Sequence, residues 1–473
     1  GDGVFASATD DVTTTGTPGV VKLCTEPKLV PTTFVAAAQK KYDPGVSDTE
    51  IKLGHTNPYS GPLSAYGVIG KAEAAYWQMV NDKGGINGRK VNFITYDDGY
   101  SPPKTVEMVR KLVEDDKVFA IFQLLGTPTN TAVHKYLNQK KVPQLFVATG
   151  ASKWGDPKNF PWTMGWQPDY ATEGGIYAKH MLSQHKGEKI AVLWQNDDSG
   201  KDYVAGFMNG LGKENEKMVV ASVSYEVTDP TVDSQIIQLR NSGATVFFND
   251  AAPKAAAQAI RKVADLGWKP AHYLTNVSAS VSSVLKPAGF DASQGIITAA
   301  YLKDPTDPQW ASAPDFLEWK AWMAKYHPTG SLSESFNVYG YAVSATMHDC
   351  LKRCGDELTR ANLMKQAASM KRLVVPMLLP GITINTSPTD YYPIQAVRLQ
   401  RFKGETWELF GDVSDEEKER FDALELDDLR EFVHFGLTSQ DINNTAIPLS
   451  WKHAIEYEYL PSLLNLKDRK SVV

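Results

Sequence analysis

The sequence predicts an α/β protein with two lobes, each built around a parallel β-sheet. Short apolar strands alternate with helices in two successive series, which an aromatic and proline-rich passage at 160–170 separates. The strands predicted at 118–124 and 245–249 are almost entirely apolar, as expected of strands that helices cover on both faces. Strand–helix–strand repeats at this spacing imply right-handed crossovers and parallel sheets.

The first series begins with a strand at 50–54 and a proline-rich turn at 57–62. An alanine-rich helix follows from Tyr66 and ends at Gly84-Gly85. Further strands are predicted at 91–97, 118–124 and 144–148, and helices at 103–115 and 130–138. A loop that leads from a strand end into a helix N-terminus suits a small anion, because free N–H groups and the helix dipole both favour negative charge.

The second series and the segment after it complete the two lobes. Helices are predicted at 172–185, 202–214, 233–241, 254–266, 314–325, 337–352 and 361–369. Strands are predicted at 189–194, 219–225, 245–249, 272–274, 295–301 and 381–385. The last elements, 396–402 and 407–410, form a predicted hairpin with Lys403-Gly404 at its turn.

Bulk composition excludes several classes of protein. The formal net charge of −6 gives no basic surface for nucleic acid or an anionic membrane. No run of about 18 apolar residues appears, so no membrane span is expected. Without a leader in this sequence, an exported protein would be a processed form. Cys350 and Cys354 lie four apart in a helical pattern, and the sequence leaves open whether they pair; two ordinary helix thiols are favoured over a metal half-site.

Several spaced motifs over residues 43–411 occur in one order that is typical of a known family. They are Gly61-Pro62 with Tyr66-Gly67, Gly84 to Gly88, Tyr96 to Asp98, Gly126-Thr127, Ala148 to Ala151, Asn196 to Asp198 with Gly200 to Asp202, and Asn337 to Ala342. This segment resembles the periplasmic substrate-binding proteins of branched-chain-amino-acid-type ABC transporters, the Leu/Ile/Val-binding family.

The resemblance implies an architecture and a function. It implies two doubly wound lobes, 43–165 with 299–378 and 166–298 with 379–411, joined by a three-segment hinge near 165–170, 298–301 and 378, after a flexible leader at 1–42. It also implies a periplasmic, monomeric receptor that delivers an amino acid, amide or organic acid to an ABC permease, with no enzymatic activity, cofactor, metal or direct membrane insertion. A ligand-sensing regulatory domain is an alternative that the sequence leaves open.

The resemblance also implies the ligand-binding residues of the first lobe. Thr127 fits a hydroxyl that holds the ligand's carboxylate, Gly150 or Ala151 the backbone amides, Ser152 a second hydroxyl, and Tyr66 the pocket tyrosine. Neutral donors of this kind can hold a carboxylate without a buried charge of their own. Each residue has a structural alternative: Thr127 as a helix cap, Tyr66 as a core aromatic and Gly150 as a turn glycine.

Two family positions depart from the pattern in the second lobe. The tyrosine that packs on the ligand aligns with Ser199, and the acid that pairs the ligand's ammonium falls at Asn276 or Val277. A buried ammonium without a charge partner would cost about 2–5 kcal/mol. A carboxylate with a neutral or aromatic remainder, or an amide, is therefore expected rather than an ordinary α-amino acid. Trp166, at the first crossover, either lines the cleft or packs the hinge.

The C-terminal segment, 412–473, changes in composition and is predicted to be a helical appendage. Residues 431–467 resemble adenylosuccinate lyases of the fumarase/aspartase superfamily, with His434, Thr438, Ser439 and Asp441 at matching positions. The catalytic serine loop of those enzymes has no counterpart in the sequence, so a fused fragment is expected. A lyase-related subunit is the alternative function that this segment raises.

Overall fold

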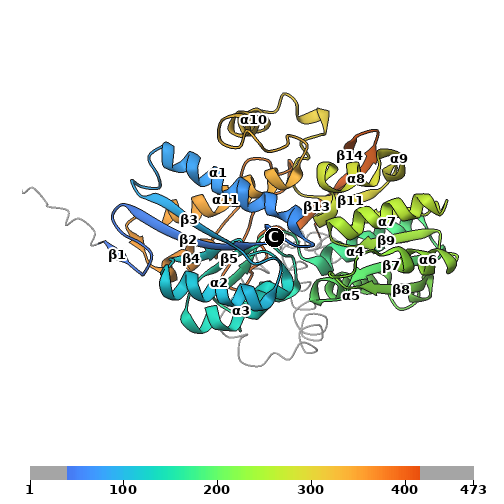
Figure 1. Cartoon of the computed structure of the whole chain (residues 1–473), viewed down its shortest axis with the longest axis horizontal. Coiled ribbons are helices and arrows are strands. Elements are labelled where there is room, and N and C mark those ends of the chain that lie inside the picture. Colours follow the sequence, from blue (N-terminus) through green and yellow to red (C-terminus); the bar gives the residue numbers. More distant parts are fainter. Residues whose placement is uncertain (1–39, 416–473) are drawn as a thin grey trace, which may run out of the picture. The chain divides into compact units, whose positions relative to one another are not determined.

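A computed structural model describes residues 40–415 of the chain, and it confirms the predicted α/β class (Figure 1). Two large sheets form the lobes, and a third, two-stranded sheet pairs β1 (Lys41–Tyr42) with β12 (Glu357–Leu358). The first sheet has five parallel strands: β2 (Glu50–Asn57), β3 (Lys90–Asp97), β4 (Ala120–Phe122), β5 (Gln144–Val147) and β6 (Thr163–Gly165). Their order is β3-β2-β4-β5-β6. We call this sheet and the helices packed on it lobe I.

Helices cover both faces of the first sheet. In Figure 1, α1 (Gly67–Asp82) and α11 (Ser335–Cys354) lie on one face, and α2 (Pro102–Arg110) and α3 (Thr127–Lys140) lie on the other. The helix α10 (Pro314–Tyr326) packs on α1, and α12 (Arg360–Ala367) packs on α11. Burial on both faces explains why β4 and β5 are buried along their whole length.

The second sheet has seven strands, and we call it, with its helices, lobe II. Its strands are β7 (Ile190–Gln195), β8 (Val219–Tyr225), β9 (Val246–Asp250), β10 (Ala271–Leu274), β11 (Ile297–Ala300), β13 (Ala396–Lys403) and β14 (Thr406–Asp415). The order is β14-β13-β11-β10-β9-β7-β8. The first five in sequence pair in parallel, whereas β13 and β14 pair antiparallel at one edge.

Alternation along β7 shows how helices sandwich the second sheet. Ile190 and Val192 belong to the core shared with α4 (Tyr170–Gln184) and α5 (Asp198–Leu211). Ala191 and Leu193 belong to the core shared with α6 (Asp233–Asn241) and α7 (Pro253–Asp265). Because successive side chains of a strand point to opposite faces, these two sets place the helix pairs on opposite sides.

Both lobes repeat one topology, and this positions the site. Counted along the chain, the parallel strands of each sheet follow the order 2-1-3-4-5. The order reverses between β2 and β4 in lobe I and between β7 and β9 in lobe II. Sheets of this type bind ligands outside the carboxyl ends of their strands, at the point of reversal.

Most predicted elements are present, with shifted ends. The helix predicted at 202–214 begins earlier, at Asp198, because the Asp197 carboxylate accepts hydrogen bonds from the backbone N–H of Ser199 at 2.9 Å and Gly200 at 3.2 Å. The strand predicted at 381–385 is wrong: only Ile384 forms a bridge, to Leu373. The predicted hairpin is confirmed, with Lys403 paired to Thr406 across its turn.

Predictions for the two ends of the chain fall mainly outside the described residues. Strand β14 continues to Asp415, so the helical appendage predicted from 412 does not begin there. The leader as far as residue 39 and the lyase-like positions His434, Thr438, Ser439 and Asp441 lie outside the described range. Within that range Cys350 and Cys354 are buried free thiols, and none of its helices is long and apolar enough to cross a bilayer.

Glycines bring α4 and α5 into close contact beneath the second sheet. A Cβ on Gly206 of α5 would lie 2.0 Å from the backbone oxygen of Ala171, at the start of α4. A Cβ on Gly174 of α4 would lie 2.5 Å from the backbone oxygen of Tyr203. Each glycine therefore lets one helix backbone approach the other more closely than any side chain allows.

We predict that Gly206→Ala destabilises the protein although alanine is the better helix former. Alanine gains about 0.5–1 kcal/mol in helix propensity, whereas forcing two helix backbones apart costs about 1–3 kcal/mol. The free energy of unfolding in urea should therefore fall. Ala205→Ser, at an exposed position of the same helix, is the control and should change it by less than about 0.5 kcal/mol. A more stable Gly206→Ala variant would contradict the close helix contact.

Candidate functional site

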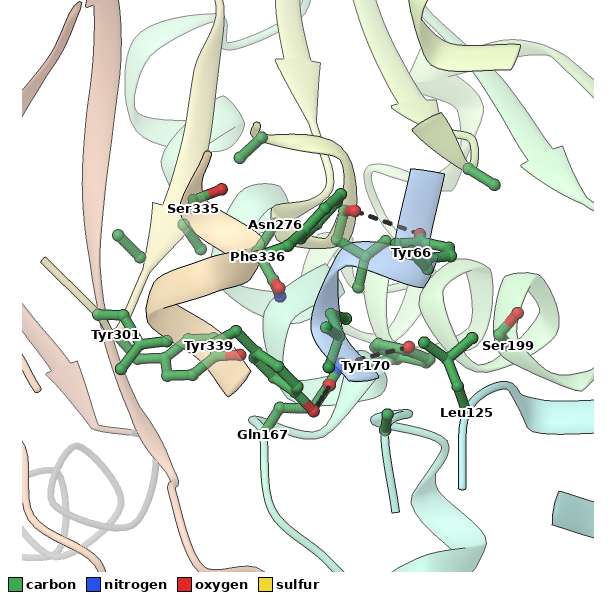
Figure 2. A pocket seen from close by; sticks show the side chains of 18 of the residues that line it. Tyr66, Leu125, Gln167, Tyr170, Ser199, Asn276, Tyr301, Ser335, Phe336 and Tyr339 are labelled. Atoms are coloured by element: carbon green, nitrogen blue, oxygen red, sulfur yellow. Dashed lines mark hydrogen bonds between the residues drawn. The ribbon is translucent and has the colours of Figure 1, made fainter. Parts of the chain in front are cut away.

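A cavity of about 130 Å³ lies where the strand ends of the two lobes face each other (Figure 2). Its volume is of the same order as the ~150 Å³ protein cavity that binds benzene. Side chains from both lobes line it, and aromatic groups are prominent among them: Tyr66, Tyr100, Tyr170, Tyr203, Tyr301, Phe336 and Tyr339. The polar lining residues include Thr127, Gln167, Gln195, Ser199, Asp250, Asn276 and Gln400.

Tyr66, a predicted ligand-binding residue, lies in the cavity wall of lobe I. It ends a short helical turn before α1, and its hydroxyl donates to the backbone oxygen of Val277 in lobe II at 3.2 Å (Figure 2). Its ring lies 5.2 Å, centroid to centroid, from that of Phe336. Tyr66 thus lines the cavity and joins the two lobes.

Thr127 also lines the cavity, at the first residue of α3. Its Oγ1 lies 2.5 Å from Oγ1 of Thr149. Gly126, just before it, has a φ of 98°, and a Cβ there would lie 2.3 Å from the Tyr100 ring. Glycine at 126 therefore allows the backbone to turn into α3 with the helix N-terminus at the cavity.

Four other predicted site residues do not line the cavity. The Ser152 hydroxyl donates to Asp169 at 2.5 Å, and the Ala151 amide donates to Thr149 Oγ1 at 3.3 Å. Gly150 is packed against the backbone of Pro168 and the ring of Tyr170. Trp166 is fully buried and donates to Thr346 Oγ1 at 3.0 Å, which is the hinge-packing alternative. Of the residues predicted to hold the ligand's carboxylate, Thr127 lines the cavity, next to Gly126.

Ser199 and Asn276, two further predicted ligand-binding residues, line the lobe II wall. Ser199 donates its hydroxyl to Asp197. This chain lacks the tyrosine that the family pattern has at position 199, but Tyr203, one helical turn later, lines the cavity, and its ring stacks on Tyr170 at 4.4 Å. Because the helix was predicted at 202–214, position 199 lay outside it, and no predicted helical spacing linked the two positions.

Glu173 holds the lobe II wall together from behind. Its carboxylate accepts hydrogen bonds from the hydroxyls of Tyr177 at 2.6 Å and Tyr203 at 2.8 Å. It also accepts from the backbone N–H of Asn276 at 2.8 Å and from the side-chain amide of that residue. Burial raises the pKa of Glu173 although these donors lower it. The network fixes Tyr203 and Asn276 in the orientations that face the cavity.

Asp250 is an acidic lining residue that sequence reasoning missed. It ends β9, at the point where the strand order of lobe II reverses, and is only 5% exposed. Its Oδ2 has no hydrogen-bond partner among residues 40–415. Burial, followed by the nearby Asp197 and Glu173 carboxylates, raises the pKa of Asp250 well above its usual value. An acid at the end of a strand that is otherwise mostly apolar was the available sequence signal.

Other polar groups near the cavity already form hydrogen bonds within the protein. Lys303 donates to both oxygens of Asp315 at 2.6 Å. Burial raises the pKa of Asp304 to about 7. Tyr339 donates to Gln167 at 2.9 Å, and Gln167 donates to the Tyr170 hydroxyl at 3.3 Å, which links α11 to the first crossover (Figure 2). Within residues 40–415 no cluster of His, Cys, Asp or Glu could hold a metal ion.

Contacts between the lobes close the cavity from two sides. Lys153 of lobe I forms an ion pair with Asp198 of α5 at 2.5 Å. On the other side, Ser280 of lobe II donates to Glu334, at the start of α11, at 2.6 Å. These contacts lie on loops and helix ends, so they can break without disturbing either sheet. The two lobes are therefore in direct contact in the described conformation.

Comparison with known proteins gives a consistent result. Residues 50–406 match the family of periplasmic binding proteins. The Leu/Ile/Val-binding protein homolog 1 of Brucella abortus is 25% identical over 340 residues, which cover 70% of this chain and 86% of that protein.

Solved structures share the fold. The branched-chain amino acid ABC transporter protein of Thermus thermophilus with bound valine matches with a TM-score of 0.71 and 16% identity over 78% of this chain and 98% of that one. A solute-binding protein of Rhodopseudomonas palustris in complex with benzoate matches with a TM-score of 0.65 and 20% identity over the same shares. The chain belongs to the periplasmic binding protein family.

Proposed function

We propose that this protein is a periplasmic solute receptor that captures a small carboxylate- or amide-containing ligand between its lobes and delivers it, as a monomer, to an ABC permease. The observation that carries the proposal is the cavity itself, which lies between the carboxyl ends of two parallel sheets and is closed by contacts from both lobes. The lining includes no histidine or cysteine, the commonest general base and thiol nucleophile. Binding rather than catalysis therefore fits the cavity.

The lobe I wall favours an anionic group on the ligand. The hydroxyl of Thr127 and the N-terminus of α3 meet at the cavity. Helix N-terminal N–H groups and the helix dipole stabilise a carboxylate, and a hydroxyl adds a neutral donor. Valine and benzoate, bound by the two structural neighbours, both carry a carboxylate and have sizes that a cavity of about 130 Å³ accommodates.

We also propose that the lobes move about three crossings of the chain. The first two follow the predicted boundaries, after β6 and around β11. For the third we favour a later position than 378. The hydroxyls of Tyr391 and Tyr392 donate to backbone oxygens of Pro161 and Ser152, near the end of lobe I, before β13 enters the second sheet at Ala396.

Calorimetry and solution scattering test the receptor function together. A panel of leucine, valine, benzoate, benzamide and urea should contain at least one ligand that binds with a 1:1 stoichiometry. The same ligand should reduce the radius of gyration, because it stabilises the closed state. Tight binding of leucine or valine with none of benzoate or benzamide would refute the ligand preference drawn from positions 276 and 277 alone, and would require a partner for the ligand's ammonium elsewhere in the cavity. Binding of none of the panel would contradict the proposed ligand class.

The Lys153–Asp198 ion pair gives a prediction about closure. Both side chains are partly exposed, 29% and 49%, so the pair should stabilise the closed state by at most about 1 kcal/mol. Lys153→Met should therefore weaken binding of the panel ligand by up to about fivefold at low salt. The loss should shrink in high salt, since screening already weakens the pair in the unmodified protein.

The control is Lys158→Met, which removes the same charge from an exposed position in the same loop. It should leave both affinity and scattering unchanged. Equal affinities of the Lys153→Met variant and the unmodified protein at low salt would show that the ion pair does not contribute to closure.

A further inference from the structure

We propose that Asp250 determines the ligand specificity of the cavity by binding a cationic nitrogen of the ligand, in practice a primary ammonium. This inference rests on the proposed receptor function and deepens it. It names a residue and a ligand group that the family pattern places elsewhere, at positions 276 and 277, where this chain has no acid.

The placement of Asp250 is that of a ligand-binding group. It ends β9 at the reversal point of the lobe II sheet, where ligands of such sheets bind. Its side chain lines the cavity and is 5% exposed, and Oδ2 has no hydrogen-bond partner within residues 40–415. Burying a carboxylate without a hydrogen-bond partner costs free energy. A ligand group that bonds to this carboxylate therefore removes most of that cost on binding.

The surrounding charges select a cation. Two further carboxylates lie close to Asp250, and both are already occupied. Asp197 caps α5 through Oδ1 and accepts from Gln195 Nε2 through Oδ2 at 2.6 Å. Glu173 accepts four hydrogen bonds from tyrosine and asparagine groups. The one lysine in the lining, Lys303, is bound to Asp315. Asp250 is therefore the acid of this group that remains available to a ligand.

The neighbouring aromatic rings strengthen the effect. Tyr170 and Tyr203 stack on each other and lie in the cavity wall near Asp250. Rings that exclude water lower the local dielectric constant, which increases the attraction between a carboxylate and a cation. On the opposite wall, Thr127 and the start of α3 favour a carboxylate. The two walls together select a small zwitterion, and this reverses the expectation that an ammonium lacks a partner.

Matched ligand pairs test the inference by calorimetry. Each pair has one member with an amino group and one without: L-leucine with 4-methylpentanoate, and L-phenylalanine with 3-phenylpropanoate. The unmodified protein should bind the amino member of a pair at least tenfold more tightly. Asp250→Asn should remove that preference and leave the affinity for the amine-free member within about twofold. Asp265→Asn, an exposed acid at the end of α7, is the matched control and should keep the preference.

The outcomes separate this inference from the proposed function. If the unmodified protein binds a pair but shows no preference for the amine, or if Asp250→Asn keeps the preference, the inference fails and the receptor function stands. If the unmodified protein binds neither pair and no ligand of the earlier panel, the receptor function fails, and this inference fails with it.

Thermal unfolding without ligand provides a second measurement. The titratable groups that face Asp250 are Asp197, Glu173, Tyr170, Tyr203 and Tyr225. None is a base. Because the folded-state pKa of Asp250 is raised, its ionisation destabilises the fold increasingly as pH rises above the usual aspartate pKa. Asp250→Asn should therefore raise Tm at pH 8 by more than at pH 4. A lower Tm at pH 8, or a variant that does not fold, would show a structural role and overturn the inference.

Discussion

The lobe II wall depends on one buried carboxylate, that of Glu173. Its four hydrogen bonds join α4, α5 and the turn after β10. The Tyr177 hydroxyl extends the network, since it also lies 2.9 Å from the backbone oxygen of Leu274 and accepts from the backbone N–H of Ala299 at 2.8 Å. A buried acid is tolerated here because every available donor points at it, and removal of any donor would leave a charge without compensation.

The Glu173 network depends on the close approach of the α4 and α5 backbones. Gly174 and Gly206 bring the backbones of α4 and α5 together, so Tyr203 of one helix reaches Glu173 of the other. Lobe I contributes to the cavity in a different way: the backbone turn at Gly126 and the N-terminus of α3 lie in its wall. A side-chain network thus orders the lobe II wall, whereas the lobe I wall combines backbone turns with side chains such as Tyr66 and Phe336.

Sequence reasoning predicted the fold well because the apolar pattern dictates it. Strands buried on both faces, such as β4 and β9, are apolar runs bounded by turns, and the alternation with helices fixes the parallel topology. Helix ends were less predictable, since α5 begins where the Asp197 side chain caps it. The strand expected at 381–385 failed because β propensity alone does not supply a pairing partner.

The site residues were only partly predictable, because an alignment compares single positions and not their arrangement in space. Motif alignment located Tyr66, Thr127, Ser199 and Asn276, which do line the cavity. It also carried over Gly150, Ala151 and Ser152, whose polar groups bond within the protein instead. It missed Asp250 and Tyr203, because a position-by-position match cannot show that another strand or the next helical turn supplies a similar group. Spatial equivalence between different positions is visible only in three dimensions.

The unequal construction of the two walls has a consequence for how such a receptor can diverge. Changes at a few lobe II side chains, Gln195, Ser199 and Asp250, alter what the cavity recognises without touching the glycines, the Glu173 network or the hinge. The lobe I wall offers less scope, because its geometry depends on backbone positions that few substitutions preserve. Ligand preference in this architecture can therefore evolve on one side of the cleft while the other side conserves the mode of capture.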